Sequence, residues 1–77
     1  MVTNEAFARR VGCNYTMASK IRNGTRKPSG GLFTRIVLAY ELDAQAATEA
    51  YAAGPVIFGD YLTAHVFNAP EMMGKAG

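Results

Sequence analysis

The chain has 77 residues, which allows one domain with one hydrophobic core, because domains usually hold about 100 to 150 residues. Its composition, 49% hydrophobic and 18% charged, is typical of a compact soluble fold and not of a disordered chain. No apolar run reaches the roughly 18 residues of a membrane helix, and the start lacks the basic and apolar regions of a secretory signal. We therefore expect a cytoplasmic protein.

The net charge of +2 conceals an uneven distribution of charge along the chain. Residues 1–40 hold seven basic side chains and one acidic side chain, which gives +6. Residues 41–77 hold one basic and five acidic side chains, which gives −4. A basic N-terminal part attracts polyanions such as nucleic acid, whereas an acidic part favours packing or contact with a partner.

The chain contains one cysteine, Cys13, and one histidine, His65. A single cysteine cannot form an internal disulfide, and the two residues cannot supply the ligands of a structural zinc site. They lie 52 positions apart, and the sequence has neither paired carboxylates on an apolar helix face nor a glycine-rich phosphate loop. We expect no metal, no cofactor and no enzymatic activity. Cys13 is predicted to be a buried free thiol and His65 a packing or surface residue.

The first predicted helix follows Thr3 and Asn4, either of which can cap it, and continues to about Val11. Its apolar residues recur at a spacing of three or four, which makes one buried face. Gly12 follows as a stop signal, because glycine adopts a positive φ without a steric penalty.

A second helix is predicted from its cap, Asn14, to Arg22 or Asn23, and Gly24 ends it in a left-handed conformation. Two short helices joined by a three-residue turn form a helix-turn-helix when small or apolar residues occupy the positions where they touch. A helix-turn-helix is therefore predicted from about Asn4 to Gly24. The inward positions are filled by Phe7, Ala8, Val11, Ala18 and Ile21.

Two further helices are predicted, and no stretch has the alternation of a strand. Residues 25–31 form a loop, since proline and paired glycines resist helix. A third helix begins at about Ser29 or Gly31 and reaches Glu41. Asp43 can cap a fourth helix, which runs to Ala53 before a glycine and a proline end it. The predicted fold is all-α, a compact bundle of four to five short helices that contains a helix-turn-helix.

The segment Val56–Phe67 is too apolar to be a solvated tail and must be buried, although Gly59 disfavours helix there. Residues 70–77 are predicted to fray. Residues 1–54 are thus expected to form a helix-turn-helix DNA-binding core. Residues 55–77 add the apolar segment and the tail, within the same single domain.

The stretch from Phe7 to Ser29 resembles the helix-turn-helix of the Cro and phage-repressor family, also called XRE-like, and the resemblance extends through residues 32–42. Its most specific parts are the Val11-Gly12 turn and the ending Ile21-x-x-Gly24-x-x-x-Pro28-Ser29, which looks like that family's recognition-helix exit. The resemblance implies a transcriptional regulator of the Cro or repressor type that binds duplex DNA sequence-specifically.

One departure from the family concerns the helix that normally precedes the helix-turn-helix and covers its core. Here only residues 1–3 stand before the motif. The chain is shortened relative to its relatives, or Val56–Phe67 folds back over the same surface, or a second subunit covers it. Such regulators usually bind two half-sites about 34 Å apart, so we expect a homodimer with Val56–Phe67 as its interface.

A recognition helix fits the major groove and presents its N-terminal and outward residues to the base edges. By the family's pattern, the base-reading residues are Tyr15, Thr16, Ser19 and Lys20. Lysine can bond guanine, and the threonine methyl can touch thymine. Phosphates are expected at the start of the first helix and beyond the second. The residues assigned to them are Asn4, Asn14, Arg22, Asn23, Thr25, Arg26 and Lys27.

Some assignments have a competing structural interpretation. Capping alone explains Asn14. Arg9 and Arg10 either keep an outer face soluble or contact DNA, and Arg35 is expected to pair with nearby acids. The rival function is a protein-interaction module, in which the helix-turn-helix is a scaffold and the Val56–Phe67 face binds a partner protein.

Overall fold

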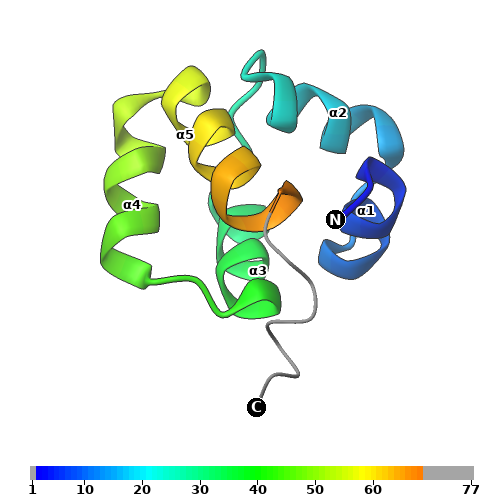
Figure 1. The fold of residues 1–77 in the computed structure, drawn as a ribbon, viewed down its shortest axis with the longest axis horizontal. Helices are drawn as coiled ribbons and strands as arrows, with labels where there is room; N and C mark the ends of the chain where they lie inside the picture. Colours follow the sequence, from blue (N-terminus) through cyan, green and yellow to red (C-terminus); the bar gives the residue numbers. More distant parts are fainter. Residues whose placement is uncertain (1, 69–77) are drawn as a thin grey trace.

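The structure is a computed structural model and describes residues 2–68. This part of the chain forms five α-helices and a short π-helical segment, and it contains no strand (Figure 1). The predicted all-α bundle is confirmed; the predicted frayed tail, residues 70–77, lies outside the described residues. The elements are α1 (Asn4–Val11), α2 (Tyr15–Asn23), α3 (Gly30–Tyr40), α4 (Ala44–Ala53), α5 (Pro55–Leu62) and η1 (Thr63–Phe67).

The first four helices begin at capping side chains. In each case a side-chain oxygen accepts a hydrogen bond of 2.7–3.2 Å from the backbone N–H three residues later. Gly12 and Gly24, at φ 80° and 79°, end α1 and α2 as predicted. The third helix ends one residue earlier than predicted, because Glu41 takes a left-handed conformation at φ 50°. The four caps are Thr3, Asn14, Ser29 and Asp43.

The core lies where all the helices meet, with α1 and α2 on one side and α4 on the other side of α5 (Figure 1). Aromatic rings fill much of it. The Phe7 ring centroid lies 4.9 Å from that of Phe67 and 5.8 Å from that of Tyr40. The largest side chains that are almost fully buried are Phe7, Val11, Ile21, Ile36, Phe58, Leu62, Val66 and Phe67.

The apolar C-terminal segment is helical and packs against the helix-turn-helix, with α5 on α2. Its four buried large side chains are Phe58, Leu62, Val66 and Phe67, none more than 2% exposed. Within the single chain, the first two residues of the segment are not buried. Val56 is 61% exposed and Ile57 is 49% exposed.

Gly59 explains how α5 approaches α2 so closely. A Cβ atom at this position would lie 3.0 Å from the carbonyl oxygen of Ile21 and 3.1 Å from that of Arg22. Glycine was predicted to disfavour helix here, yet α5 continues through Gly59. The absence of a side chain allows the backbones of α5 and α2 to come into contact. The segment is also tied to the start of the chain, since the Val2 N–H donates to the Phe67 carbonyl at 3.1 Å.

The helices of the structure are short. None of the helices within residues 2–68 is both long enough and apolar enough to span a bilayer.

Candidate nucleic-acid interface

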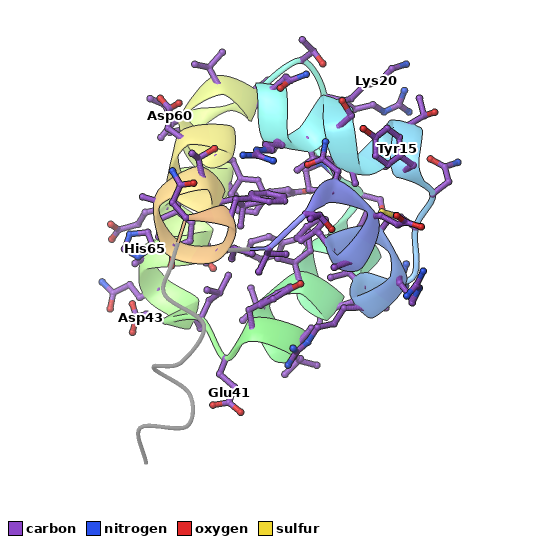
Figure 2. The ribbon with its side chains drawn as sticks, turned by 45° about the vertical axis from the view of Figure 1, so that its right-hand side comes forward. Tyr15, Lys20, Glu41, Asp43, Asp60 and His65 are labelled. Carbon is purple, nitrogen blue, oxygen red and sulfur yellow. The ribbon has the colours of Figure 1, made fainter. Side chains whose placement is uncertain are left out.

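Helix α2 has one buried and one exposed side. Ala18 and Ile21 are fully buried against the core, and they hold the inward side in place. The exposed side carries three of the four predicted base-reading residues, while the fourth, Ser19, is half-buried. Figure 2 shows Tyr15 and Lys20 on the same side of the molecule. The three exposed residues are Tyr15, Thr16 and Lys20.

The two asparagines of α2 are engaged within the helix. Asn14 Oδ1 accepts from the Met17 N–H at 2.7 Å, so the cap interpretation of Asn14 describes its contact. Asn23 Nδ2 donates a long hydrogen bond of 3.5 Å to Ser19 Oγ. Both asparagines are nevertheless exposed. Their remaining donor and acceptor capacity faces water, which leaves them able to bond an additional group.

Asn4 and Arg22, both assigned to phosphate, are bonded to each other. An Arg22 Nη1 donates to Asn4 Oδ1 at 3.0 Å, and the guanidinium carbon lies 4.6 Å from the Phe67 ring centroid. The bond joins the start of α1 to the end of α2, with η1 beneath the arginine. These two side chains border an open hollow of about 510 Å³. Its lining residues are Val2, Thr3, Asn4, Glu5, Tyr15 and Arg22.

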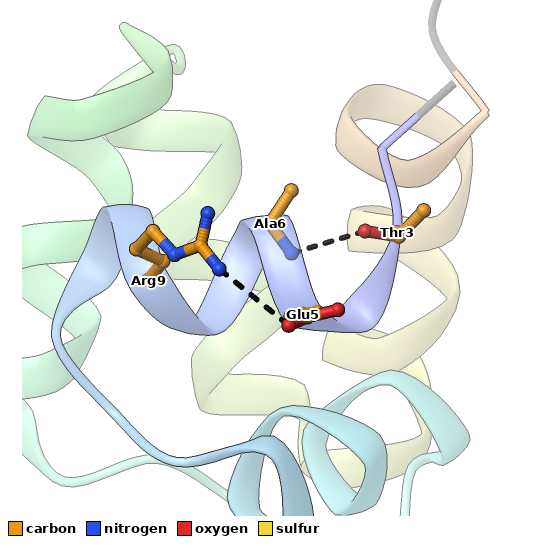
Figure 3. A network of polar contacts seen from close by, with 4 residues as sticks. All are labelled: Thr3, Glu5, Ala6 and Arg9. Carbon is orange, nitrogen blue, oxygen red and sulfur yellow. Dashed lines mark hydrogen bonds and ion pairs between the residues drawn. The ribbon is translucent and has the colours of Figure 1, made fainter.

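The first turn of α1, whose polar contacts are drawn in Figure 3, forms one edge of this hollow. Thr3 Oγ1 accepts from the Ala6 N–H at 3.0 Å, and Glu5 Oε2 lies 3.5 Å from Arg9 Nη2. Both charged side chains are about three-quarters exposed, and exposed pairs of this kind contribute roughly 0.3–0.5 kcal/mol. The pair leaves the Glu5 carboxylate partly neutralised at the edge of the hollow.

Two other arginines have structural partners that the sequence analysis missed. Arg10 Nη2 donates to the Ala39 carbonyl at 2.7 Å, and its guanidinium carbon lies 4.7 Å from the Tyr40 ring centroid. Arg35 Nε donates to the Val11 carbonyl at 2.8 Å. Within residues 2–68 Arg35 forms no ion pair, so its described contact is a backbone carbonyl and not the acid that was predicted.

The loop after α2 begins with a tight exit. Both the N–H and the hydroxyl of Thr25 donate to the Lys20 carbonyl, at 3.0 and 3.2 Å. The hydroxyl predicted to contact phosphate therefore caps the end of α2. Arg26 is exposed, and within residues 2–68 its side chain makes no hydrogen bond or ion pair. Of the predicted phosphate contacts, Arg26 is thus the cation most free to meet an anion.

Lys27 and Pro28 in the same loop contact an aromatic side chain of α4. The Lys27 Nζ lies 4.4 Å from the Tyr51 ring centroid, and the Tyr51 hydroxyl donates to the Pro28 carbonyl at 2.6 Å. No local pattern predicts these contacts, because the partners are 23 or more positions apart.

The uneven charge of the sequence is also uneven in space. Figure 2 shows Lys20 on the side opposite to Asp43, Asp60 and His65. The His65 ring centroid lies 4.5 Å from that of Tyr61, and the histidine is exposed, which agrees with its predicted surface position. Within residues 2–68, no group of three acidic, cysteine or histidine side chains is arranged to hold a metal ion.

Cys13, in the turn between α1 and α2, is a free thiol. The prediction that Cys13 is buried is only partly correct, since the residue is half-buried. Its neighbours in the turn, Gly12 and Asn14, are both exposed. Burial raises the pKa of the Cys13 thiol, and the nearby Arg35 guanidinium partly opposes this shift.

Comparisons with protein families, with curated proteins and with solved structures found no match for this chain.

Proposed function

We propose that this protein is a sequence-specific regulator of transcription that binds duplex DNA with α2 in the major groove. The observation that carries the proposal is the two-sided character of α2. Its inward side is fixed by the buried Ala18 and Ile21, while Tyr15, Thr16 and Lys20 are free of the core. An α-helix of this kind fits the major groove and can present such side chains to base edges. The resemblance to the Cro and phage-repressor family points the same way.

The distribution of charge supports the proposal that the exposed side of α2 faces DNA. Lys20 on α2 lies on the side of the molecule opposite to the acidic Asp43 and Asp60 (Figure 2), and Arg26, in the loop that follows α2, is exposed. A phosphate backbone is attracted to the first side and repelled by the second. The open hollow at the start of α1 carries one basic and one acidic side chain, Arg22 and Glu5, so it adds shape to this face and no net charge.

A homodimer remains part of the proposal, because one short helix makes few base contacts and two half-sites are usually read together. The exposed apolar residues of the expected interface are Val56 and Ile57. They lie beside the exit of α2, where a Cβ atom on Gly24 would be 3.1 Å from the Val56 Cα atom. A cytoplasmic location, where such a regulator meets DNA, is proposed with it.

The test begins with selection of a preferred duplex from a random pool. Thr16→Ala and Lys20→Ala should each weaken binding to the selected duplex by about 1–3 kcal/mol and change binding to random duplex little. Thr48→Ala, at an exposed threonine of α4, is the matched control and should bind both duplexes as the parent does. Equal losses on the two duplexes would remove Thr16 and Lys20 as readers, and a pool without a preferred sequence would exclude sequence-specific binding.

The rival function, a protein-interaction module, requires an apolar face on the C-terminal segment. Only Val56 and Ile57 remain as large exposed apolar residues of that segment, so the face is small. The salt dependence of binding to random duplex distinguishes the two functions. Phosphate contacts give a steep decrease of affinity with salt, whereas a pure protein binder gives no DNA affinity to measure.

A further inference from the structure

We propose that Tyr51 of α4 is a positioning residue, which holds the basic loop in the conformation that meets the DNA backbone. The basic loop is residues 25–28, between α2 and the cap of α3. This inference rests on the proposed DNA-binding function and assigns a role within it to a helix that itself lies outside the helix-turn-helix.

The two ends of the basic loop are fixed by their neighbouring helices. At the start, Thr25 donates twice to the Lys20 carbonyl of α2. At the end, the Ser29 side chain accepts from the Leu32 N–H at 3.2 Å and caps α3. The residues between these ends have no further hydrogen bond to either helix within the described part of the chain.

Tyr51 supplies the missing tether. Its hydroxyl donates to the Pro28 carbonyl at 2.6 Å, which is the one hydrogen bond within residues 2–68 that joins the loop to a helix other than its neighbours. The same ring faces the Lys27 ammonium, 4.4 Å from the ring centroid. One side chain thus holds two consecutive loop residues, one by its hydroxyl and one by its ring.

The tether is held in place because the partly buried Tyr51 ring packs against the core. Its centroid lies 4.3 Å from that of Phe33 on α3 and 5.5 Å from that of Phe58 on α5. Aromatic pairs at these distances resist reorientation of the ring. The loop conformation is therefore set by three helices packed behind it.

The consequence for binding is preorganisation of Arg26. This exposed arginine precedes the two tethered residues, Lys27 and Pro28, and its side chain makes no hydrogen bond or ion pair within residues 2–68. A cation on an ordered loop contacts phosphate without first losing backbone freedom, whereas a cation on a mobile loop must be ordered when it binds. Tyr51 thus acts on DNA through Arg26, without touching the DNA itself.

The test compares Tyr51→Phe with Tyr61→Phe. The first change removes only the hydroxyl and keeps the ring in its stack, so the fold should persist. Tyr61 belongs to the same row of rings but its hydroxyl makes no hydrogen bond within the described residues, which makes it the matched control. NMR order parameters of the Arg26 and Lys27 amides in the free protein should decrease in Tyr51→Phe and stay unchanged in Tyr61→Phe.

Binding of duplex DNA is then measured across a range of salt concentrations in a double-mutant cycle. Tyr51→Phe should lower affinity by up to about tenfold, because the untethered loop must be ordered on binding and the tether it loses is one hydrogen bond. Arg26→Ala should reduce the salt slope by roughly 1 in the parent and by less in the Tyr51→Phe background. Lys20→Ala, on the helix and not in the loop, should cause the same loss in both backgrounds.

Unchanged order parameters in Tyr51→Phe, or losses from Tyr51→Phe and Arg26→Ala that simply add, would overturn the positioning role. If the parent protein binds no DNA at any salt concentration, the proposed function fails, and with it the role in DNA binding. The order parameters then still decide whether Tyr51 orders the loop.

Discussion

Helix α2 and the C-terminal segment, α5 with η1, pack against each other but use their residues in opposite ways. The nine residues of α2 include two buried ones, Ala18 and Ile21, and its outward side is polar. The segment buries four large apolar side chains and exposes mainly Val56 and Ile57 among its large ones. The proposed DNA recognition and the stability of the fold therefore depend on different elements, the first on α2 and the second on the C-terminal segment.

This division has a direct consequence for variants. Changes on the outward side of α2 should alter binding and leave the free energy of unfolding near its parent value, because exposed positions seldom contribute more than about 0.5 kcal/mol. Changes in the C-terminal segment should act through stability first. Three sets of variants test where this division holds, and a fourth prediction concerns the reactivity of Cys13 in the turn before α2.

The largest effect is expected for Phe58→Ala. This side chain is 1% exposed, and its ring meets those of Phe33, Tyr51 and Tyr61. Its loss should lower the free energy of unfolding by about 3–5 kcal/mol, measured by urea denaturation. Ile57→Ala, at the half-exposed neighbouring position, is the control and should cost much less. Similar losses for the two variants would show that the segment is not packed as described.

A smaller loss is expected for Gly59→Ala, because the added Cβ atom would meet backbone oxygens of α2 at 3.0 and 3.1 Å. Overpacking against backbone costs typically about 1–3 kcal/mol. Gly31→Ala, in α3, is the matched control, since a Cβ atom there meets nothing within 4 Å and alanine is the better helix former. The two changes should shift the melting temperature in opposite directions; a rise for both would mean that α5 does not touch α2.

Asn14 tests the same division at the start of α2. Its cap bond contributes to stability, whereas its proposed phosphate contact would contribute to DNA affinity. Asn14→Ala should lower the free energy of unfolding by about 1 kcal/mol through loss of the bond to the Met17 N–H. Asn14→Ser retains a capping oxygen and should restore stability. If Asn14→Ser also restores DNA affinity, a small capping side chain is sufficient and the Asn14 amide is not required for binding; a stable variant with weakened binding would retain the amide as a phosphate contact.

The smallest effect concerns Cys13. Burial raises its pKa, so the folded state holds the thiol proton more tightly than the unfolded chain does. The stabilisation is present below the unfolded pKa and is lost as the pH rises through the folded pKa, so stability should decrease slightly under alkaline conditions. Iodoacetamide at pH 8 should alkylate the folded protein more slowly than the urea-unfolded chain. Equal alkylation rates for the folded and the unfolded chain, after correction for the effect of urea on the reagent, would contradict a shielded thiol.

The boundaries of the first four helices could be predicted from sequence to within one or two residues, because their causes are local, whereas α5 and η1 were expected only as a buried apolar segment. The cap bond from Thr3, for example, spans three residues, and the turn at Gly12 needs only the freedom of glycine. The exposed face of α2 followed from helical spacing for the same reason. Glu41 was missed, since no short-range signal marks a glutamate that takes a left-handed conformation.

The contacts that shape the candidate site could not be predicted, because they join distant parts of the chain. Arg22 meets Asn4 across 18 positions and Phe67 across a longer interval. Tyr51 reaches Pro28 across 23 positions. Gly59 was misjudged for a related reason. From sequence alone a glycine indicates a weak helix, whereas here it allows α5 to lie against the backbone of α2, which is distant in sequence.

The contact between Phe7 and Phe67 also sets the order of events during synthesis. These two rings meet at 4.9 Å although 60 positions separate them, and the Val2 N–H bonds to the same C-terminal phenylalanine. Closing so long a loop carries an entropic cost that must be met before the contact stabilises anything. On a ribosome, the helix-turn-helix emerges first, and the η1 side chains that complete its core follow later. We therefore expect a chain that ends before η1 to be less stable than the full chain, because Phe7 then lacks its contact with Phe67.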